Sequence, residues 1–197
     1  MKYYKLLTQE MTSHNNTKWE LNVPVTIEKE GNKMCTDQVL HCYNHPLLAV
    51  ILNPIHANIK NPLLFEISVD NIVASDGLKF ASKSQTLIKE IPLPEISLEQ
   101  KIEFGIRVAK TIYTEKKWNE WADKWLDGSD RSKESADNGA ADAAYAAYAA
   151  AYGAYAAANA VAAYAANAAN AAAYAAAKNE FNQKMISIIE SIVKMNN

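Results

Sequence analysis

Two cysteines and two histidines lie close together between positions 35 and 45, and they are the first candidates for chemistry in this chain. The four residues are Cys35, His41, Cys42 and His45. Cysteine and histidine are ligands of zinc, and a cysteine beside a histidine base can act as a nucleophile. The spacing contains no Cys-x-x-Cys pair, and the adjacent His41 and Cys42 would point to opposite faces of a strand. We therefore expect two buried free cysteines beside a polar turn, with no metal site, no cofactor and no cysteine nucleophile.

Three tryptophans recur at a helical spacing among lysines. They are Trp118, Trp121 and Trp125, interleaved with Lys116, Lys117 and Lys124. Aromatic side chains among basic ones can stack the bases of a single-stranded nucleic acid. Glu115, Glu120 and Asp123 cancel the positive charge locally. The pattern therefore favours packing, and we keep the three tryptophans as candidate binding residues for a protein partner.

The overall charge and the absence of known motifs argue against several classes of protein. The 197 residues include 20 basic and 22 acidic side chains, a net charge of −2, whereas a nucleic-acid binder carries a basic excess. The sequence has no Gly-rich phosphate loop, no Gly-x-Ser-x-Gly element and no His-Glu-x-x-His element. The first residues lack the apolar run of a signal peptide. Asparagines interrupt the long uncharged run of residues 143–177, which disfavours a membrane span. We expect a cytoplasmic protein.

Alternating apolar residues predict antiparallel strands in the first hundred residues. One strand is indicated by the unbroken alternation of Trp19, Leu21, Val23, Val25 and Ile27. Pro24 falls on the other phase, which predicts an edge strand or a bulge. A second strand is indicated at Phe65, Ile67 and Val69, and Asp76-Gly77 predicts a hairpin turn.

Helix signals follow and separate these strands. His45-Pro46 predicts a short helix through Leu52 that Pro54 ends. Ser97 and Gln100 form a capping box at the start of a long helix that continues into the tryptophans. At the end of the chain, an amphipathic helix is indicated by Phe181, Met185, Ile188, Ile189 and Ile192, and its apolar face needs a partner.

Residues 140–177 consist almost entirely of alanine. Of these 38 residues, 26 are alanine, six are tyrosine and three are asparagine. Alanine has the highest helix propensity, so the segment is predicted to be helical. Four tyrosines near its start share one helical face: Tyr145, Tyr148, Tyr152 and Tyr155. Tyrosine offers a large rigid contact area, so we expect these four residues to bind a partner or a second copy of the chain.

These patterns together predict an α+β fold with three parts. Residues 1–126 are expected to form a small antiparallel sheet domain with helices. Residues 127–138 have no apolar period and read as a linker. Residues 139–197 are expected to form an Ala-rich, all-helical segment that makes the protein a homo-oligomer.

Four features of the chain together resemble a family of uncharacterised proteins of bacteriophages and prophages. They are the short Tyr-Lys start, the element Leu40-His41-Cys42, the strand from Leu64 to Val69 and the Ala-rich helical tail. Val39 replaces a glycine expected before the Leu-His pair. The resemblance implies a viral accessory protein without known catalytic residues, for which inhibition of a host defence system is the expected role. The same elements are similar to the split sheet of ADP-ribosyltransferase-like folds, although the acidic catalytic signature of those folds is not identifiable.

The sequence therefore supports two hypotheses of different classes. The first is a non-enzymatic phage protein that binds a protein of the host, in the host cytoplasm. The alternative is an enzyme that acts on a nucleotide, or a protein that sequesters one. Capture of a host protein and turnover of a nucleotide would discriminate between them.

Overall fold

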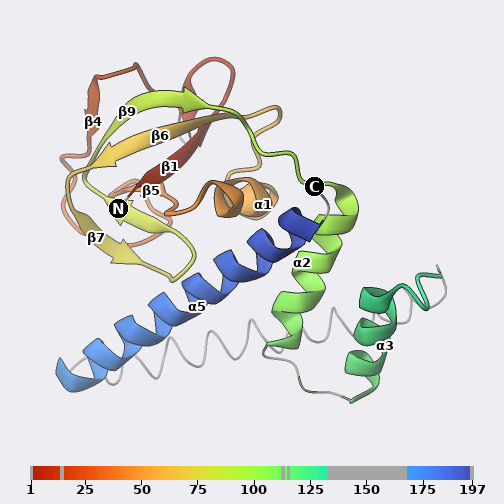
Figure 1. Ribbon diagram of the computed structural model, residues 1–197. Coiled ribbons are helices and arrows are strands. Elements are labelled where there is room, and N and C mark those ends of the chain that lie inside the picture. The colour runs from red at the N-terminus through yellow and green to blue at the C-terminus, as the bar shows by residue number, and fades with distance from the viewer. Residues whose placement is uncertain (1, 14–15, 112–113, 115, 133–167, 196–197) are drawn as a thin grey trace. The chain divides into compact units, whose positions relative to one another are not determined.

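The computed structural model describes residues 2–13, 16–111, 114, 116–132 and 168–195 (Figure 1). The fold is α+β, with antiparallel sheets in the first half and helices in the second half. The chain divides into two compact units. The first unit contains Met1–Ile96 and Lys178–Glu190, and the second contains Ser97–Ala177 and Ser191–Asn197.

Nine strands in the described part of the first unit form three antiparallel sheets. The largest sheet has the order β1 (Tyr3–Leu7), β6 (Leu63–Val69), β9 (Ser84–Ile91) and β4 (Pro24–Thr26). The second has the order β5 (Leu40–Cys42), β8 (Phe80–Ser82) and β7 (Ile72–Ser75). The third pairs β2 (Thr12–Ser13) with β3 (Thr17–Lys18).

Strand β1 joins the two larger sheets. The backbones of Tyr4 and Tyr43 exchange two hydrogen bonds, of 2.7 and 2.9 Å, directly after β5 ends. Apolar side chains of both sheets therefore share one core, which consists of Leu7, Trp19, Leu40, Cys42, Phe65, Ile67 and Leu87.

The strand predicted over residues 19–27 is largely wrong. Trp19 is buried, but Leu21 is 45% exposed and Val23 is 43% exposed, so the alternation does not correspond to one buried face. Asn22 adopts a φ of 62°, which interrupts an extended strand. Only Pro24–Thr26 remain as β4. The edge position indicated by Pro24 is confirmed, because β4 is the last strand of its sheet.

The other strand predictions are confirmed. Phe65, Ile67 and Val69 lie in β6, whose first two residues pair with the end of β1. Asp76 and Gly77 form the turn between β7 and β8. Gly77 has a φ of 89°, and one carboxylate oxygen of Asp76 accepts hydrogen bonds from the backbone N–H groups of Leu78 and Lys79. This local bonding explains why the two-residue signal located the hairpin.

Helix α1 (Pro46–His56) lies beside β1 in the first unit (Figure 1). His45 is its N-cap, and His45 Nδ1 accepts a hydrogen bond from the N–H group of Leu47. The predicted end at Pro54 is wrong, because Pro54 lies inside the helix. The last turn is held by Asn53, whose side chain exchanges two hydrogen bonds with the backbone of Ile59 and whose carbonyl accepts from Ala57. These bonds stabilise the end of the helix beyond Pro54, whose missing N–H group leaves one helical hydrogen bond unmade.

The second unit contains helices α2 (Leu98–Lys110) and α3 (Lys116–Asp127). The predicted capping box is confirmed: Ser97 Oγ accepts from the N–H group of Gln100, and Gln100 Oε1 accepts from the N–H group of Ser97. The predicted single long helix is wrong, since α2 ends at Lys110 and the tryptophans lie on α3.

Helix α5 (Ala168–Met195) carries the amphipathic pattern predicted for the end of the chain. Its residues 178–190 belong to the first unit. Met185 and Ile189 are fully buried, and Asn182 accepts a 2.6 Å hydrogen bond from the amide of Asn44. His45 Nε2 lies 3.1 Å from a carboxylate oxygen of Glu190. The apolar face that needs a partner is therefore covered within one chain. The predicted helix over residues 139–167 lies outside the described residues.

Candidate functional site

A group of polar and titratable side chains lies on the three-stranded sheet β5–β8–β7, which we call the small sheet, on the face opposite the core. Leu40 and Cys42 point into the core, so His41 and the following Tyr43 point to the other face. His56, at the end of α1, contacts Tyr43. Asp76 and Lys79 come from the turn between β7 and β8. We refer to His41, Tyr43, His56, Asp76 and Lys79 as the imidazole–lysine cluster.

The rings of the imidazole–lysine cluster are held in place by direct contacts. The Tyr43 hydroxyl lies 2.7 Å from His56 Nδ1, and the two rings stack with their centroids 5.9 Å apart. His41 Nε2 accepts a 3.0 Å hydrogen bond from the backbone N–H group of Cys35. In neutral His41 the proton is therefore on Nδ1. Each imidazole keeps one nitrogen without a hydrogen bond to the described residues.

Lys79 gives the imidazole–lysine cluster a positive charge. It is only 8% exposed, and its ammonium forms no hydrogen bond with the residues that the structure describes. The nearest carboxylate oxygen is Asp76 Oδ2, at 3.9 Å. Burial, followed by the charge of Lys79 and then that of Lys5, lowers the pKa of His41 to about 4. Burial and the charge of Lys79 also lower the pKa of His56.

Lys5 lies under the small sheet, inside the core. Its ammonium donates to the carbonyl of His41 at 2.7 Å and to Gln85 Oε1 at 3.1 Å, and it lies 4.5 Å from the ring centroid of Trp19. Burial lowers the pKa of Lys5 to about 8. Two hydrogen bonds and a cation–π contact match the three N–H groups of an ammonium. We therefore assign Lys5 a structural role.

The cysteines and histidines singled out by the sequence do not converge on a metal. In the described ranges, no group of three or more Cys, His, Asp and Glu side chains could hold a metal ion. Cys42 is buried, and burial raises the pKa of its thiol to about 12. Cys35 is exposed. His45 uses one nitrogen to cap α1 and the other to contact Glu190.

The tryptophans lie in a separate core in the second unit. Trp118 and Trp125 are buried with Ile106 and Ala122, and Trp121 packs against this cluster. Arg131 lies over the ring of Trp125, at 4.5 Å from its centroid. Their burial leaves little of these rings for a ligand. The other candidate binding residues, Tyr145, Tyr148, Tyr152 and Tyr155, lie outside the described residues.

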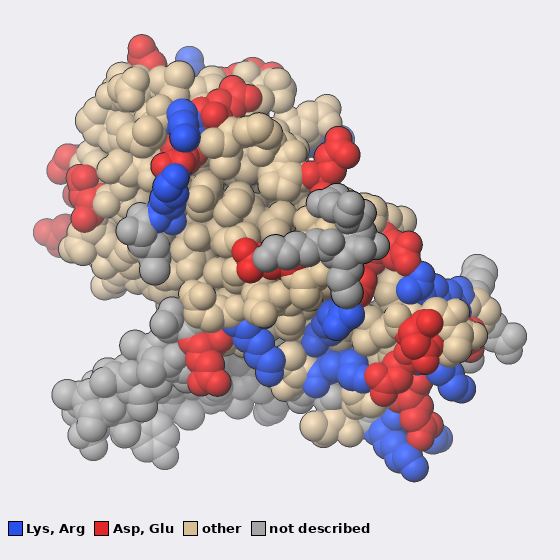
Figure 2. All heavy atoms as spheres, in the orientation of Figure 1, with Lys and Arg blue, Asp and Glu red and all other residues tan. Residues whose placement is uncertain are grey.

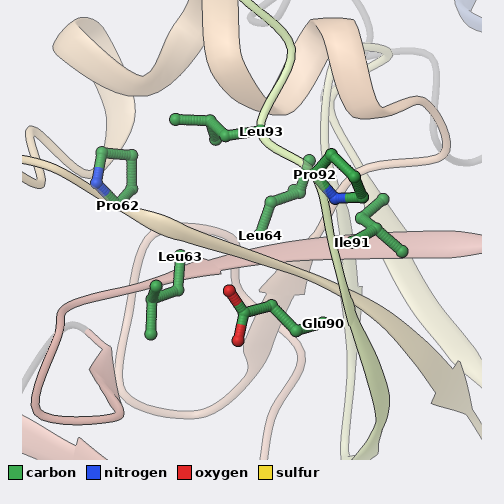
Figure 3. Close-up of a pocket in the computed structure, with 7 residues that line it drawn as sticks. All are labelled: Pro62, Leu63, Leu64, Glu90, Ile91, Pro92 and Leu93. Atoms are coloured by element: carbon green, nitrogen blue, oxygen red, sulfur yellow. The ribbon is translucent and has the colours of Figure 1, made fainter.

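An aliphatic pocket of about 400 Å³ lies where β6 begins and β9 ends. Such a volume is sufficient for a large side chain or a small molecule. Figure 3 shows Leu63 and the carboxylate of Glu90 on one side of the β6 ribbon and Leu93 on the other side. Within the described residues, the Glu90 carboxylate has neither a hydrogen bond nor an ion pair. We use the name aliphatic pocket for the space lined by Pro62, Leu63, Leu64, Glu90, Ile91, Pro92 and Leu93.

Basic and acidic side chains are interspersed on the face shown in Figure 2. Several are paired within the second unit, such as Arg131 with Glu99 and Lys110 with Asp123. The chain has nearly equal numbers of basic and acidic side chains, 20 and 22, so such pairs leave little net charge. Among the helices that the structure describes, none has both the length and the apolar character required to cross a membrane.

The comparisons with known proteins concern the first half of the chain. The α+β fold is built on antiparallel sheets, and its sheet-forming part is the part that matches a family. Residues 1–99 match the model of a domain of unknown function, DUF7666. The chain belongs to this family. No curated protein and no solved structure matches it.

The matched residues include both candidate sites. The imidazole–lysine cluster and the aliphatic pocket lie entirely within residues 1–99, and this range ends close to the boundary of the first unit at Ile96. The tryptophans of α3 lie beyond it. Both sites therefore lie in the part of this chain that matches the family.

Part of both sites was missed in the sequence. Asp76 was recognised only as a turn residue, and Lys79 gives no local signal because strand pairing brings it near the imidazoles. The aliphatic pocket left a weak signal. Prolines interrupt two apolar runs, at Pro62-Leu63-Leu64 and at Ile91-Pro92-Leu93, and proline is confined to the edges and ends of strands.

Proposed function

We propose that this protein acts by binding another protein, and that the aliphatic pocket receives an apolar side chain of that partner. The observation that carries this proposal is the composition of the pocket, in which one carboxylate stands among aliphatic side chains. Interfaces are dominated by a few apolar residues that fill such pockets. Glu90 adds a preference, because a lysine or arginine next to the inserted side chain would pair with it.

The chemistry of the core supports binding over catalysis. The Cys42 thiol is buried and its pKa is raised to about 12, so it is not a thiolate at neutral pH. The Lys5 ammonium is occupied by the carbonyl of His41 and by Gln85. These groups have the types that catalysis uses, and their contacts in the described part of the chain stabilise the fold.

The resemblance to bacteriophage proteins directs the choice of partner. We propose a component of a host defence system, bound and inhibited in the cytoplasm of a bacterial host. The resemblance to ADP-ribosyltransferase-like folds supplies the alternative, an enzyme that acts on a nucleotide or a protein that sequesters one.

The proposal is tested by capturing partners with the full chain and with variants of the pocket. Leu93→Arg and Glu90→Lys place a positive charge in the pocket and should reduce capture of a stoichiometric partner by about tenfold or more. Ile55→Arg is the matched control, because Ile55 is 77% exposed and lies outside the pocket. This control should retain capture.

Two results would contradict the proposal. If Leu93→Arg and Ile55→Arg capture the same partner equally well, the aliphatic pocket is not the binding site. Turnover of a nucleotide by the purified chain would exclude a purely binding role and favour the alternative.

A further inference from the structure

The imidazole–lysine cluster contains one ammonium, that of Lys79, and one carboxylate, that of Asp76. Lys79 and Lys5 both depress the pKa of His41, and in the described residues the only carboxylate that opposes them there is Asp76. One oxygen of Asp76 already accepts two backbone N–H groups, and the other lies 3.9 Å from the Lys79 ammonium. Lys79 is 8% exposed as a residue, and its ammonium forms no hydrogen bond with the described residues. Lys79 therefore has unused capacity to bind an anion.

Two further donors belong to the same group of side chains. His41 carries its proton on Nδ1, because Nε2 accepts from Cys35. His56 contacts the Tyr43 hydroxyl through Nδ1, which leaves Nε2 without a hydrogen bond to the described residues. Both imidazoles are partly exposed. Both also feel the charge of Lys79. The pairing of Cys42 with Phe80 sets Tyr43 across from Lys79, and the Tyr43 ring stacks on His56. His41 alternates with Cys42 and lies on the same face, so the three donors gather on one face of the sheet.

We propose that the imidazole–lysine cluster is an anion-binding site, with Lys79, His41 and His56 as donors to a phosphate group. Phosphate offers several acceptor oxygens and a charge that Lys79 can pair. Binding would protonate or polarise the imidazoles, because an anion favours their charged form. This site shares no residue with the aliphatic pocket, so it does not depend on the proposed protein partner.

To test this proposal, inorganic phosphate is added to the full chain, and the imidazole nitrogen resonances of its histidines are followed by NMR. His41 and His56 should shift with one common dissociation constant. His45 is an internal control, since Leu47 and Glu190 occupy both of its nitrogens. If His41 and His56 do not shift at about 10 mM phosphate, a dissociation constant below about 10 mM is ruled out and the proposal is wrong.

A pair of variants tests the role of the ammonium. Lys79→Met should weaken phosphate binding by about tenfold or more, the loss expected for one charge-assisted hydrogen bond. Lys89→Met is the matched control, because the Lys89 side chain is 60% exposed on β9 and lies outside the imidazole–lysine cluster. Lys79→Arg retains the charge and should retain binding. Unchanged affinity in a folded Lys79→Met variant would overturn the assignment.

The source of the phosphate group is determined by a second ligand. Adenosine monophosphate that binds more tightly than inorganic phosphate, with the same shifts of His41 and His56, would indicate a phosphate ester as the natural ligand. Equal affinity would indicate the free anion. If adenosine monophosphate binds without shifting either imidazole, and phosphate does not shift them either, the site lies elsewhere and the proposal fails.

Discussion

At the scale of single residues, Lys5 occupies the most unusual environment in the first unit. Its ammonium is buried, and two oxygens and the face of Trp19 surround it. Burial lowers its pKa to about 8, from an ordinary value of 10.5. A buried charge that is fully hydrogen-bonded can stabilise one arrangement of a core without adding net stability.

Lys5→Met should therefore change how stability depends on pH. Between pH 8 and 10.5 the folded chain has lost the Lys5 proton and the unfolded chain retains it, so this group makes the free energy of unfolding rise with pH. The difference between wild type and variant should change by up to about 3 kcal/mol over this range. Urea unfolding at several pH values measures the difference. Parallel pH profiles for the two proteins would show that Lys5 has an ordinary pKa.

At the scale of helices and strands, local bonding explains which predictions succeeded. Ser97 and Gln100 bond to each other across one turn, so the start of α2 could be predicted. Asp76 and Gly77 likewise form their turn locally. The strand prediction over residues 19–27 was wrong because Asn22 adopts a left-handed conformation that interrupts the strand. The alternation of the neighbouring apolar residues does not reveal this interruption.

Long-range contacts explain what could not be predicted. His41 and Lys79 approach each other through the pairing of β5 with β8, which joins segments about 40 positions apart. The residue types of His41, Cys42 and His45 were visible in the sequence, but their orientations follow from the sheet and helix that hold them.

The capping box gives a prediction for α2. Ser97→Ala removes the oxygen that accepts from Gln100 and should lower the free energy of unfolding by about 1 kcal/mol. Ser97→Asn provides another side-chain acceptor and should retain most of the stability. Thermal unfolding followed by circular dichroism at helical wavelengths compares the two. Unchanged stability in Ser97→Ala would mean that the hydroxyl does not cap the helix.

At the scale of the whole molecule, the first unit is built from two distant parts of the chain. Residues 178–190 of α5 belong with residues 1–96, and Met185 and Ile189 are fully buried. The matched family domain ends at residue 99. The first unit of this chain therefore includes helical residues that lie outside the matched range.

Ile189→Ala should destabilise the first unit although it lies far outside the matched residues. Removing most of a buried isoleucine side chain costs about 2–5 kcal/mol. Amide hydrogen exchange of β1 and β6 should become faster in this variant. Gln183→Ala, on the exposed side of the same helix, should leave the exchange unchanged. If the amide exchange of β1 and β6 is unchanged in Ile189→Ala, the packing of α5 does not contribute to the stability of the sheets.

Self-association through the tyrosines stays a prediction. Changing Tyr148 and Tyr152 together to alanine should preserve helix content, since alanine has the higher helix propensity. The oligomer expected from the tyrosine face should dissociate, which light scattering measures. A wild-type chain that is monomeric at high concentration would contradict the expectation.

The divided first unit also has a consequence for the order of synthesis. The ribosome makes residues 1–96 first, then residues 97–177, and only afterwards the helical segment that completes the unit. Domains in general fold as their residues emerge. In this chain we expect the surface that Met185 and Ile189 cover to stay exposed on the nascent sheets until Glu190 has left the ribosome. During this interval a chaperone could bind the uncovered surface in place of α5.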